Sequence, residues 1–303
     1  MKKKLSLVLA TLMLLGLLAG CGGQPAASGD KDTVVVYIGD IFNSMTPYMT
    51  TANSDQAVFD QVYETLTVTK DDGTVAPCLA KSWKMSDDCL EYTFQLEEGV
   101  KFHNGEVMTA DDVVYSFEQY LANPAKNNFV SMIDKVEMVD ANTVKVTLNK
   151  ITPLFLVYIN ELPILNKKFV EEHNGNISDV ACGTGPYKLT SIDLATSAML
   201  ERNDDYRLAP AAIEKVELRY VGDRSTASVQ LETGDLDIMS IDPSQLVSFE
   251  NNDKFTVEKV QTLKTALLAI NTTVAPLDNK LVRQAMTYAV DKKSVITIAY
   301  ENC

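Results

Sequence analysis

Residues 58–117 read VFDQVYETLTVTKDDGTVAPCLAKSWKMSDDCLEYTFQLEEGVKFHNGEVMTADDVVYSF, and their pattern decides how the rest of the chain is interpreted. Apolar side chains at helical spacing over 58–63 predict an amphipathic helix, which leads into a short strand over 66–69. Beyond the next turn, Pro77 is expected to open one helical turn that reaches Trp83. The first half of the stretch is therefore interpreted as helix, strand and helical turn.

The second half of this stretch predicts a half-buried strand and a capped helix. Over 91–96 the side chains alternate, with three apolar residues on one face and polar residues on the other. The Asn104-Gly105 turn follows, and then Thr109 and Asp112 make an N-terminal capping signal. The residues after Thr109 place their apolar side chains on one face, as a helix packed on a core requires.

Alternation, turn residues and helical periodicity predict the elements downstream. The expected strands are 136–138, 144–148, 187–192, 196–202, 215–221, 236–241, 255–260 and 266–271. The expected helices are 167–173, 224–233, 280–290 and a last one, capped by Asp291, that runs to about Tyr300. The strand, helix and strand over 215–241 are compatible with a parallel pairing.

The motifs PCLAKSW, GVKFHNG and TADDVVYSF, in this order, closely resemble one family, the extracellular solute-binding proteins of peptide/nickel-type ABC importers (bacterial solute-binding protein family 5). Further stretches support the resemblance over nearly the whole chain after residue 32. They are GTGPY at 183–187, LETGDLD at 231–237, Asn271 with Pro276-Leu277, and VRQAMTYAVD at 282–291. One of these motifs alone would be weak, whereas all of them in order are specific.

The resemblance implies an α/β protein with the type II, two-lobed fold of periplasmic binding proteins, with most of the second lobe missing from this chain. It also implies how the chain divides. The expected parts are a lipoprotein signal peptide at 1–20, a flexible tether at 21–32, lobe one at 33–57 and 184–270, an inserted subdomain of lobe one at 58–183, and the start of lobe two at 271–303.

Candidate ligand contacts follow from the same resemblance. The first strand and its loop border the cleft in the family, so the loop residues Asp40, Ile41, Phe42 and Asn43 are candidates. Phe42 as a core residue and Asn43 as a turn residue is an alternative that the sequence leaves open. The crossing into lobe two supplies two more candidates, Thr265 and Leu267.

The N-terminus has the pattern of a secretory leader. Lys2-Lys3-Lys4 precede an apolar stretch to Leu18, which is too short for a comfortable membrane span of roughly 20 residues. Leu18-Ala19-Gly20-Cys21 then resembles a bacterial lipobox, which implies that Cys21 carries a lipid and becomes the mature N-terminus. The small, polar residues 22–32 are typical of a flexible tether.

Charge and residue types exclude several classes of function. The net charge of −14 argues against nucleic acid as a partner. The two histidines, His103 and His173, lie at no spacing that predicts a metal or catalytic site, and Asp111 and Asp112 are explained by the first turn of a helix. No catalytic residue, metal or cofactor is expected, and the chain is not expected to be an enzyme.

The cysteines leave two interpretations open. Apart from Cys21, they are Cys78, Cys89, Cys182 and Cys303, and none of them forms a C-x-x-C motif. A disulfide between Cys78 and Cys89 is conceivable outside the cytoplasm. The favoured alternative is that all four are small buried side chains.

The function implied by the resemblance is capture and not reaction. The expected protein is a lipid-anchored, extracytoplasmic binder on the bacterial cell membrane, which takes up a peptide or peptide-like solute and delivers it to an ABC transporter permease. Its expected partners are that ligand, the permease and, through Cys21, the lipid membrane, and it is expected to be a monomer at full length. The alternatives are a nickel-chelate or other small-solute binder of the family, and a sensory or adhesive surface lipoprotein. Because the family continues well past 288–291, the chain is also expected to be a fragment that binds its ligand weakly.

Overall fold

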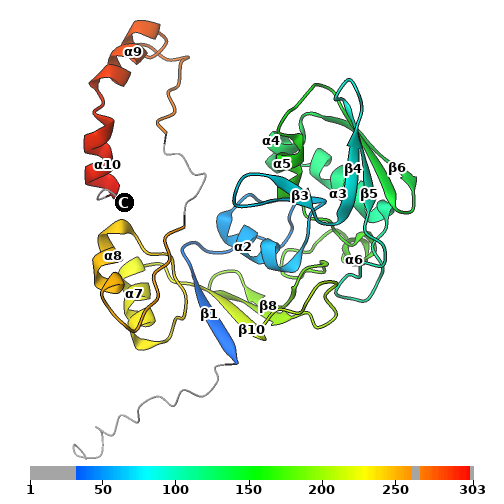
Figure 1. Ribbon diagram of the computed structural model, residues 1–303, viewed down its shortest axis with the longest axis horizontal. Coiled ribbons are helices and arrows are strands. Elements are labelled where there is room, and N and C mark those ends of the chain that lie inside the picture. The colour runs from blue at the N-terminus through cyan, green and yellow to red at the C-terminus, as the bar shows by residue number, and fades with distance from the viewer. Residues whose placement is uncertain (1–31, 261–266, 301–303) are drawn as a thin grey trace, which may run out of the picture. The chain divides into compact units, whose positions relative to one another are not determined.

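The structure, a computed structural model, describes residues 32–260 and 267–300 (Figure 1). Two four-stranded sheets dominate this part of the chain, and a two-stranded hairpin accompanies them. The hairpin pairs β2 (Thr67–Thr69) with β3 (Val75–Pro77).

The first sheet has the order β4-β5-β7-β6, and all its neighbouring strands are antiparallel. Its strands are β4 (Ala80–Met85), β5 (Glu91–Leu96), β6 (Ile133–Asp140) and β7 (Thr143–Leu148). On the central strands β5 and β7 every second residue is an apolar side chain directed into the core, including Phe94 and Val146, which are 0% exposed. The alternation over 91–96 therefore predicted both the strand and its buried face correctly.

Helix α3 (Ala110–Ala122) packs on β6 and β7. Its capping box forms as predicted: the backbone N–H of Thr109 donates to Asp112 Oδ2 at 2.9 Å, and the Thr109 side chain accepts from the Asp112 backbone. Tyr120 is fully buried, and its hydroxyl donates to the Pro163 carbonyl at 2.6 Å. The helix is thus fixed at its start by the cap and near its end by a buried hydrogen bond.

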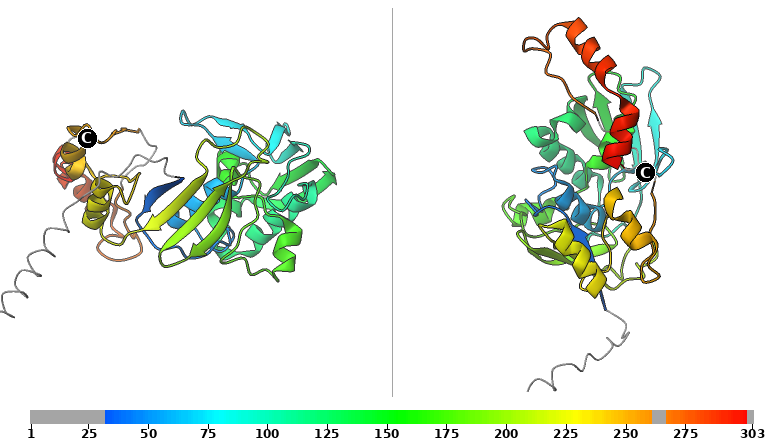
Figure 2. Two further views of the ribbon diagram at one scale, coloured as in Figure 1. Left: turned by 90° about the horizontal axis from the view of Figure 1, so that it is seen from below. Right: turned by 90° about the vertical axis from the view of Figure 1, so that its left-hand side faces the viewer.

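The second sheet has the order β1-β10-β9-β8, and β1 lies beside β10 in Figure 2. Its strands are β1 (Thr33–Ile38), β8 (Tyr187–Asp193), β9 (Ser197–Arg202) and β10 (Lys215–Tyr220). After β10 the chain forms α7 (Arg224–Thr233), which ends as predicted at Gly234 in the left-handed conformation (φ 83°). It then returns beside β1, where Ile238 pairs in parallel with Val36.

One hydrophobic core joins the two sheets. Helix α2 (Asn53–Val62) packs on β8, and its residues Val58, Phe59 and Val62 are buried in the same cluster as Phe94 of the first sheet and Leu200 of the second. The periodicity over 58–63 thus marked the C-terminal part of a helix that lies at the centre of the fold.

The other described helices are short or lie late in the chain. They are η1 (Pro124–Lys126), α4 (Asn127–Val130), α5 (Phe155–Tyr158), η2 (Ile159–Glu161), α6 (Lys167–Glu172), α8 (Pro243–Glu250), α9 (Lys280–Ala289) and α10 (Lys292–Tyr300). As predicted, Asp291 caps α10, since its Oδ2 accepts from the Ser294 hydroxyl at 2.6 Å.

Three predictions from the sequence are wrong. The helical turn from Pro77 to Trp83 is extended chain, because Trp83 pairs with Phe94 across β4 and β5. The segment 236–241 makes a single bridge at Ile238 and not a full strand. The segments 255–260 and 267–271 form no strand: no described strand lies beside them, and Val260, Leu267 and Leu268 are exposed. Residue 266 lies outside the described residues.

The helix α8 was not predicted, although the sequence carried its signal. Asp242 accepts from the backbone of Gln245, and Pro243 occupies the first turn, where its missing N–H costs nothing. The described cysteines Cys78, Cys89 and Cys182 are free thiols, so the disulfide between Cys78 and Cys89 is not formed. Of these three only Cys182 is fully buried.

Candidate functional site

The loop after β1, residues 39–52, is held at the start of α2 by one buried carboxylate. Asp55 is 0% exposed, and it accepts the backbone N–H of Asn43 at 2.7 Å and the Thr50 hydroxyl at 2.6 Å. A carboxylate is costly to bury unless hydrogen bonds replace the water that it loses. These bonds therefore fix the loop in one conformation, which keeps its outer side chains in place.

A broad hollow of about 860 Å³ opens beside this loop. Two segments far apart in the sequence, 43–52 and 174–178, form most of its wall. They are joined because the Tyr48 hydroxyl donates to the Gly175 carbonyl at 3.1 Å and the Met45 N–H donates to the Ser178 carbonyl at 2.8 Å. The lining is uncharged and rich in Asn, Ser and Thr, so it offers hydrogen bonds without attracting either sign of charge.

The candidate ligand contacts fall in different environments. Asn43 is exposed and lines this hollow, and Asp40 is exposed at the start of the loop. Ile41 is 48% exposed, whereas Phe42 is 2% exposed and belongs to the core, as the alternative interpretation had it. The ring of Phe42 cannot contact a ligand while it is packed in this way.

The remaining candidates do not join this hollow. Leu267 is 77% exposed and lines a separate hollow of about 620 Å³, together with Met286 of α9 and Ile296 of α10. Thr265 and the lipidation candidate Cys21 lie outside the described residues.

Another hollow, of about 540 Å³, lies beside α2 and is called the second hollow below. The sequence did not predict a binding role for the residues that line it. Asp60, Glu64 and Glu161 give it an acidic lining. Burial raises the pKa of Asp60, and the Gln56 amide, which donates to it at 2.7 Å, acts in the opposite direction. This hollow therefore differs in charge from the first one, although both border α2 or the loop that leads into it.

Glu64 is already paired at the edge of the second hollow. Its side chain is 7% exposed, and its Oε1 lies 2.7 Å from Arg207 Nη2 and accepts the Tyr206 hydroxyl at 3.0 Å. The Cys78 thiol donates to the same oxygen at 3.6 Å, and burial raises the pKa of Cys78 to about 11, so the thiol keeps its proton. The ion pair between Arg207 and Glu64 connects the segment after β9 to the end of α2.

Besides Glu64, Lys126 is a charged side chain whose burial could not be predicted from the sequence. It is 1% exposed, and its Nζ lies 5.7 Å from the centre of the Phe129 ring. Burial lowers the pKa of Lys126, an effect that the charge of Glu161 opposes. Among the residues that the structure describes, no carboxylate lies within 4.0 Å of this ammonium. Its neighbour Ala125 lines the first hollow.

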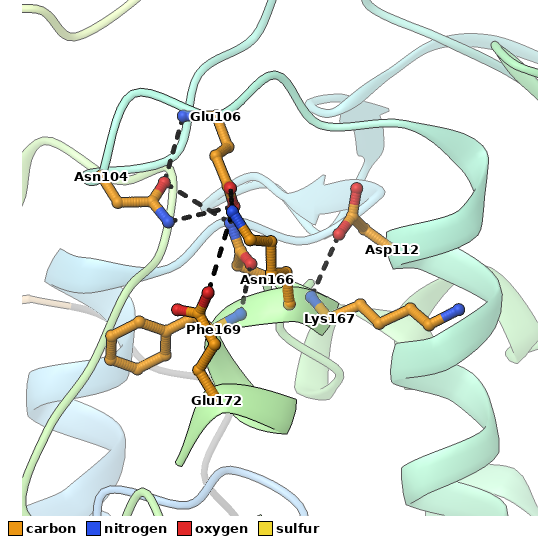
Figure 3. A network of polar contacts seen from close by, with 8 residues as sticks. Asn104, Glu106, Asp112, Asn166, Lys167, Phe169 and Glu172 are labelled. Carbon is orange, nitrogen blue, oxygen red and sulfur yellow. Dashed lines mark hydrogen bonds and ion pairs between the residues drawn. The ribbon is translucent and has the colours of Figure 1, made fainter.

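A network of polar contacts fixes the turn after Phe102 to the start of α6 (Figure 3). Glu106 Oε2 accepts from Asn166 at 2.9 Å and from Asn104 at 3.1 Å, and Glu106 Oε1 forms an ion pair with Lys168. These donors lower the pKa of Glu106 to about 2, with Lys168 the largest contributor. The network is structural, because each of its polar groups is satisfied by another.

The described part of the chain offers no cluster of three or more His, Cys, Asp or Glu side chains that could hold a metal ion. Over the same residues, every helix is too short or too polar to cross a membrane.

Comparison with known proteins places this geometry in a family. Residues 74–302 match the model of the bacterial extracellular solute-binding proteins, family 5. The heme-binding protein A of Haemophilus influenzae is 29% identical, over 99% of this chain and 62% of its own length. The structure of NikZ from Campylobacter jejuni in complex with Ni(L-His) has a TM-score of 0.79 at 30% identity, over 90% of this chain and 56% of that one. The structure of DppA from Helicobacter pylori in complex with the peptide STSA has a TM-score of 0.76 at 28% identity, over 89% and 58% of the two chains.

These matches confirm the predicted fold class, a mixed α/β fold of the type II periplasmic-binding-protein kind. The chain spans little more than half the length of these relatives. The relatives are solute-binding proteins and not enzymes, in agreement with the absence of a catalytic motif from the sequence. The chain belongs to the bacterial extracellular solute-binding proteins of family 5, the binding components of ABC importers.

Proposed function

We propose that this protein captures a peptide or peptide-like solute outside the cytoplasm and delivers it to the permease of an ABC importer. Family membership supports the capture of a solute, and the DppA relative, solved with a peptide, supports the ligand class. The protein works by binding, and ligand-dependent closure of two lobes would allow the permease to distinguish its loaded form from its empty form.

The observation that supports a ligand with an anionic group is the buried ammonium of Lys126, which such a group would reach by displacing the side chains that cover it. A desolvated charge without an ion-pair partner is unfavourable, so an anionic group that approached it would gain an unusually strong interaction. A peptide carries such a group at its C-terminal carboxylate. The uncharged hollow beside Ala125 offers hydrogen-bond partners of the kind that peptide groups need.

The division of the chain is part of the proposal. The sheet β1-β10-β9-β8 belongs to lobe one (33–57 and 184–270), and the sheet β4-β5-β7-β6 belongs to a subdomain inserted at 58–183. Residues 271–303 begin the second lobe. Asp40, Ile41 and Asn43 remain candidate contacts on lobe one, with Lys126 added, and Thr265 and Leu267 remain candidates at the crossing.

The proposal also includes a lipid anchor at Cys21, which would hold the protein to the bacterial membrane as a monomer. A nickel chelate remains the alternative ligand, because NikZ was solved with one. A chelate of this kind also carries carboxylates that Lys126 could bind.

Calorimetric titration tests the ligand class, with the protein used at its natural length from Cys21 to the end of its reading frame. We expect di- and tripeptides with a free C-terminus to bind at least about tenfold more tightly than their amides, a difference of about 1.4 kcal/mol. The Lys126→Met variant should bind both forms equally, and Lys84→Met, on the exposed strand β4, should behave as the wild type. Silence with all peptides, together with clear binding of nickel–histidine or heme, would overturn the peptide proposal.

A further inference from the structure

His103 bridges two glycines at the point where the chain passes from the first sheet to the second. Its Nδ1 accepts the backbone N–H of Gly183 at 3.3 Å, and its Nε2 contacts the carbonyl of Gly185 at 3.0 Å. The backbone N–H of His103 donates to the Gly183 carbonyl at 2.9 Å. The ring and its own backbone thus hold both ends of the Gly183–Gly185 turn.

These contacts allow only one form of the ring. An N–H donor at Gly183 requires that Nδ1 carry no proton, and a carbonyl acceptor at Gly185 requires that Nε2 carry one. The neutral ring protonated on Nε2 satisfies both. A ring with two protons would place an N–H against the Gly183 N–H, so the first contact would become repulsive.

The turn that the His103 ring holds has no space for a side chain at Gly183 or Gly185. A Cβ at position 183 would lie 2.0 Å from the Val62 carbonyl oxygen, and a Cβ at position 185 would lie 2.5 Å from the Gln61 carbonyl oxygen. The Gly185 N–H donates to the Val62 carbonyl at 2.9 Å. The turn is therefore pressed against the C-terminal end of α2, and a change at the His103 ring is transmitted there directly.

The surroundings of the ring favour its neutral form. Burial lowers the pKa of His103 to about 4, and the charge of Lys188 on β8 acts in the same direction. The hydrogen bond to Gly185 and the charge of Glu64 at the end of α2 oppose this shift. Glu64 is already paired with Arg207, and Glu106, on the turn that carries His103, is paired with Lys168, so neither carboxylate is free to hold a charged imidazole.

We propose that His103 is a positioning residue that works as a proton-sensitive clasp. Its neutral ring holds the Gly183–Gly185 turn against α2, and a second proton on the ring opens the turn. Opening loosens Tyr63 and Glu64 at the end of α2, which line the second hollow, so acid weakens the site as well as the fold. This inference goes beyond solute capture and does not depend on which solute is carried.

Imidazole NMR of the mature protein tests the clasp directly, because the chain has only two histidines. The His173→Gln variant assigns the signals. We expect the nitrogen shifts of His103 to show a single neutral tautomer with its proton on Nε2 at pH 7, and we expect this ring to titrate near pH 4. An ordinary titration near pH 6.5, or a mixture of tautomers at pH 7, would overturn the proposal without any variant at position 103.

A substitution separates the clasp from a merely structural histidine. Because the native ring binds fewer protons than the unfolded one between pH 6.5 and 4, the wild-type unfolding constant should rise by up to about tenfold per pH unit as the pH falls through this window. Glutamine keeps one donor and one acceptor but cannot titrate, so His103→Gln should fold at pH 7. Its unfolding constant should lack the rise between pH 6.5 and 4 that is due to His103, whereas His173→Gln should keep this rise. The same pH dependence in His103→Gln as in the wild type would overturn the proposal.

Discussion

Two buried charges, Glu64 and Lys126, show how differently single residues are satisfied in this protein. Glu64 is surrounded by donors, with Arg207, Tyr206 and Cys78 on one oxygen, whereas the Lys126 ammonium lies over the aromatic ring of Phe129. A buried ion pair adds little net stability, but breaking it leaves an uncompensated charge. Glu64 therefore has a role in holding the fold, whereas the Lys126 ammonium, at 1% exposure, could meet a ligand only if the side chains that cover it moved.

The pair between Glu64 and Arg207 should be costly to break from either side. We expect Arg207→Leu to lower the free energy of unfolding by about 3–5 kcal/mol, because Glu64 would stay buried without its cation. Denaturant unfolding at pH 7 measures this difference. Lys81→Ala, which breaks the exposed pair with Glu98, should cost less than about 1 kcal/mol. Equal losses in the two variants would contradict the structural role of Glu64.

Neither Glu64 nor Lys126 could be identified from the sequence, and the reason is physical. Burial of a charged side chain depends on which distant segments pack around it, and Arg207 lies far from Glu64 along the chain. The loop candidates 40–43 were found only because a family resemblance pointed to them. The sequence could not decide between core and ligand contact for Phe42, since that depends on how the loop bends around Asp55.

Among the elements, those with local signals at their ends were predicted best. Helix α7 was predicted over its full length, with Gly234 as the stop signal, and in the structure Asp223 also caps its start. The segment 77–83 was mistaken for a helical turn, because its extended form depends on pairing with 91–96 and Pro77 alone suggests a helix start. The segments 255–260 and 267–271 were mistaken for strands, because an apolar pattern forms a strand only where a neighbouring strand is present to pair with it.

The capping box of α3 makes a prediction at this scale. Thr109→Ala should lower the free energy of unfolding by about 0.5–2 kcal/mol, because the first turn of the helix loses its side-chain acceptor. Thermal or denaturant unfolding measures the loss. Glu118→Ala, on the exposed face of the same helix, should stay within about 0.5 kcal/mol of the wild type. A loss no larger than that of Glu118→Ala would show that α3 is held by its packing alone.

For the whole molecule, the proposed anchor predicts a change of location. Cys21→Ser removes the thiol that would take the lipid, so we expect the variant to leave the membrane fraction when cells are fractionated and blotted for the protein. Cys89→Ser, at a half-buried free thiol that is not part of the leader sequence, should stay with the membrane. A Cys21→Ser variant that remains in the membrane as fully as the wild type would show that the leader anchors the protein without a lipid.

The last part of the chain makes a prediction about association. None of the described residues of α9 is buried, and its apolar residues include Leu281 at 71% and Tyr288 at 90% exposure. Exposed apolar surface of this kind promotes association. Residues 22–303 alone should therefore show an average mass that rises with concentration in light scattering, whereas the protein at the length of its relatives should stay monomeric.

A charged side chain introduced among the exposed apolar residues of α9 should reverse the association. Leu281→Glu combined with Tyr288→Ser removes two of its large apolar side chains, so we expect the average mass of residues 22–303 to fall toward that of the monomer. Gln284→Glu adds the same charge at an exposed polar position of α9 and controls for charge repulsion alone. If residues 22–303 are monomeric at every concentration, or if Gln284→Glu is as effective as the double variant, then the apolar face of α9 does not drive association.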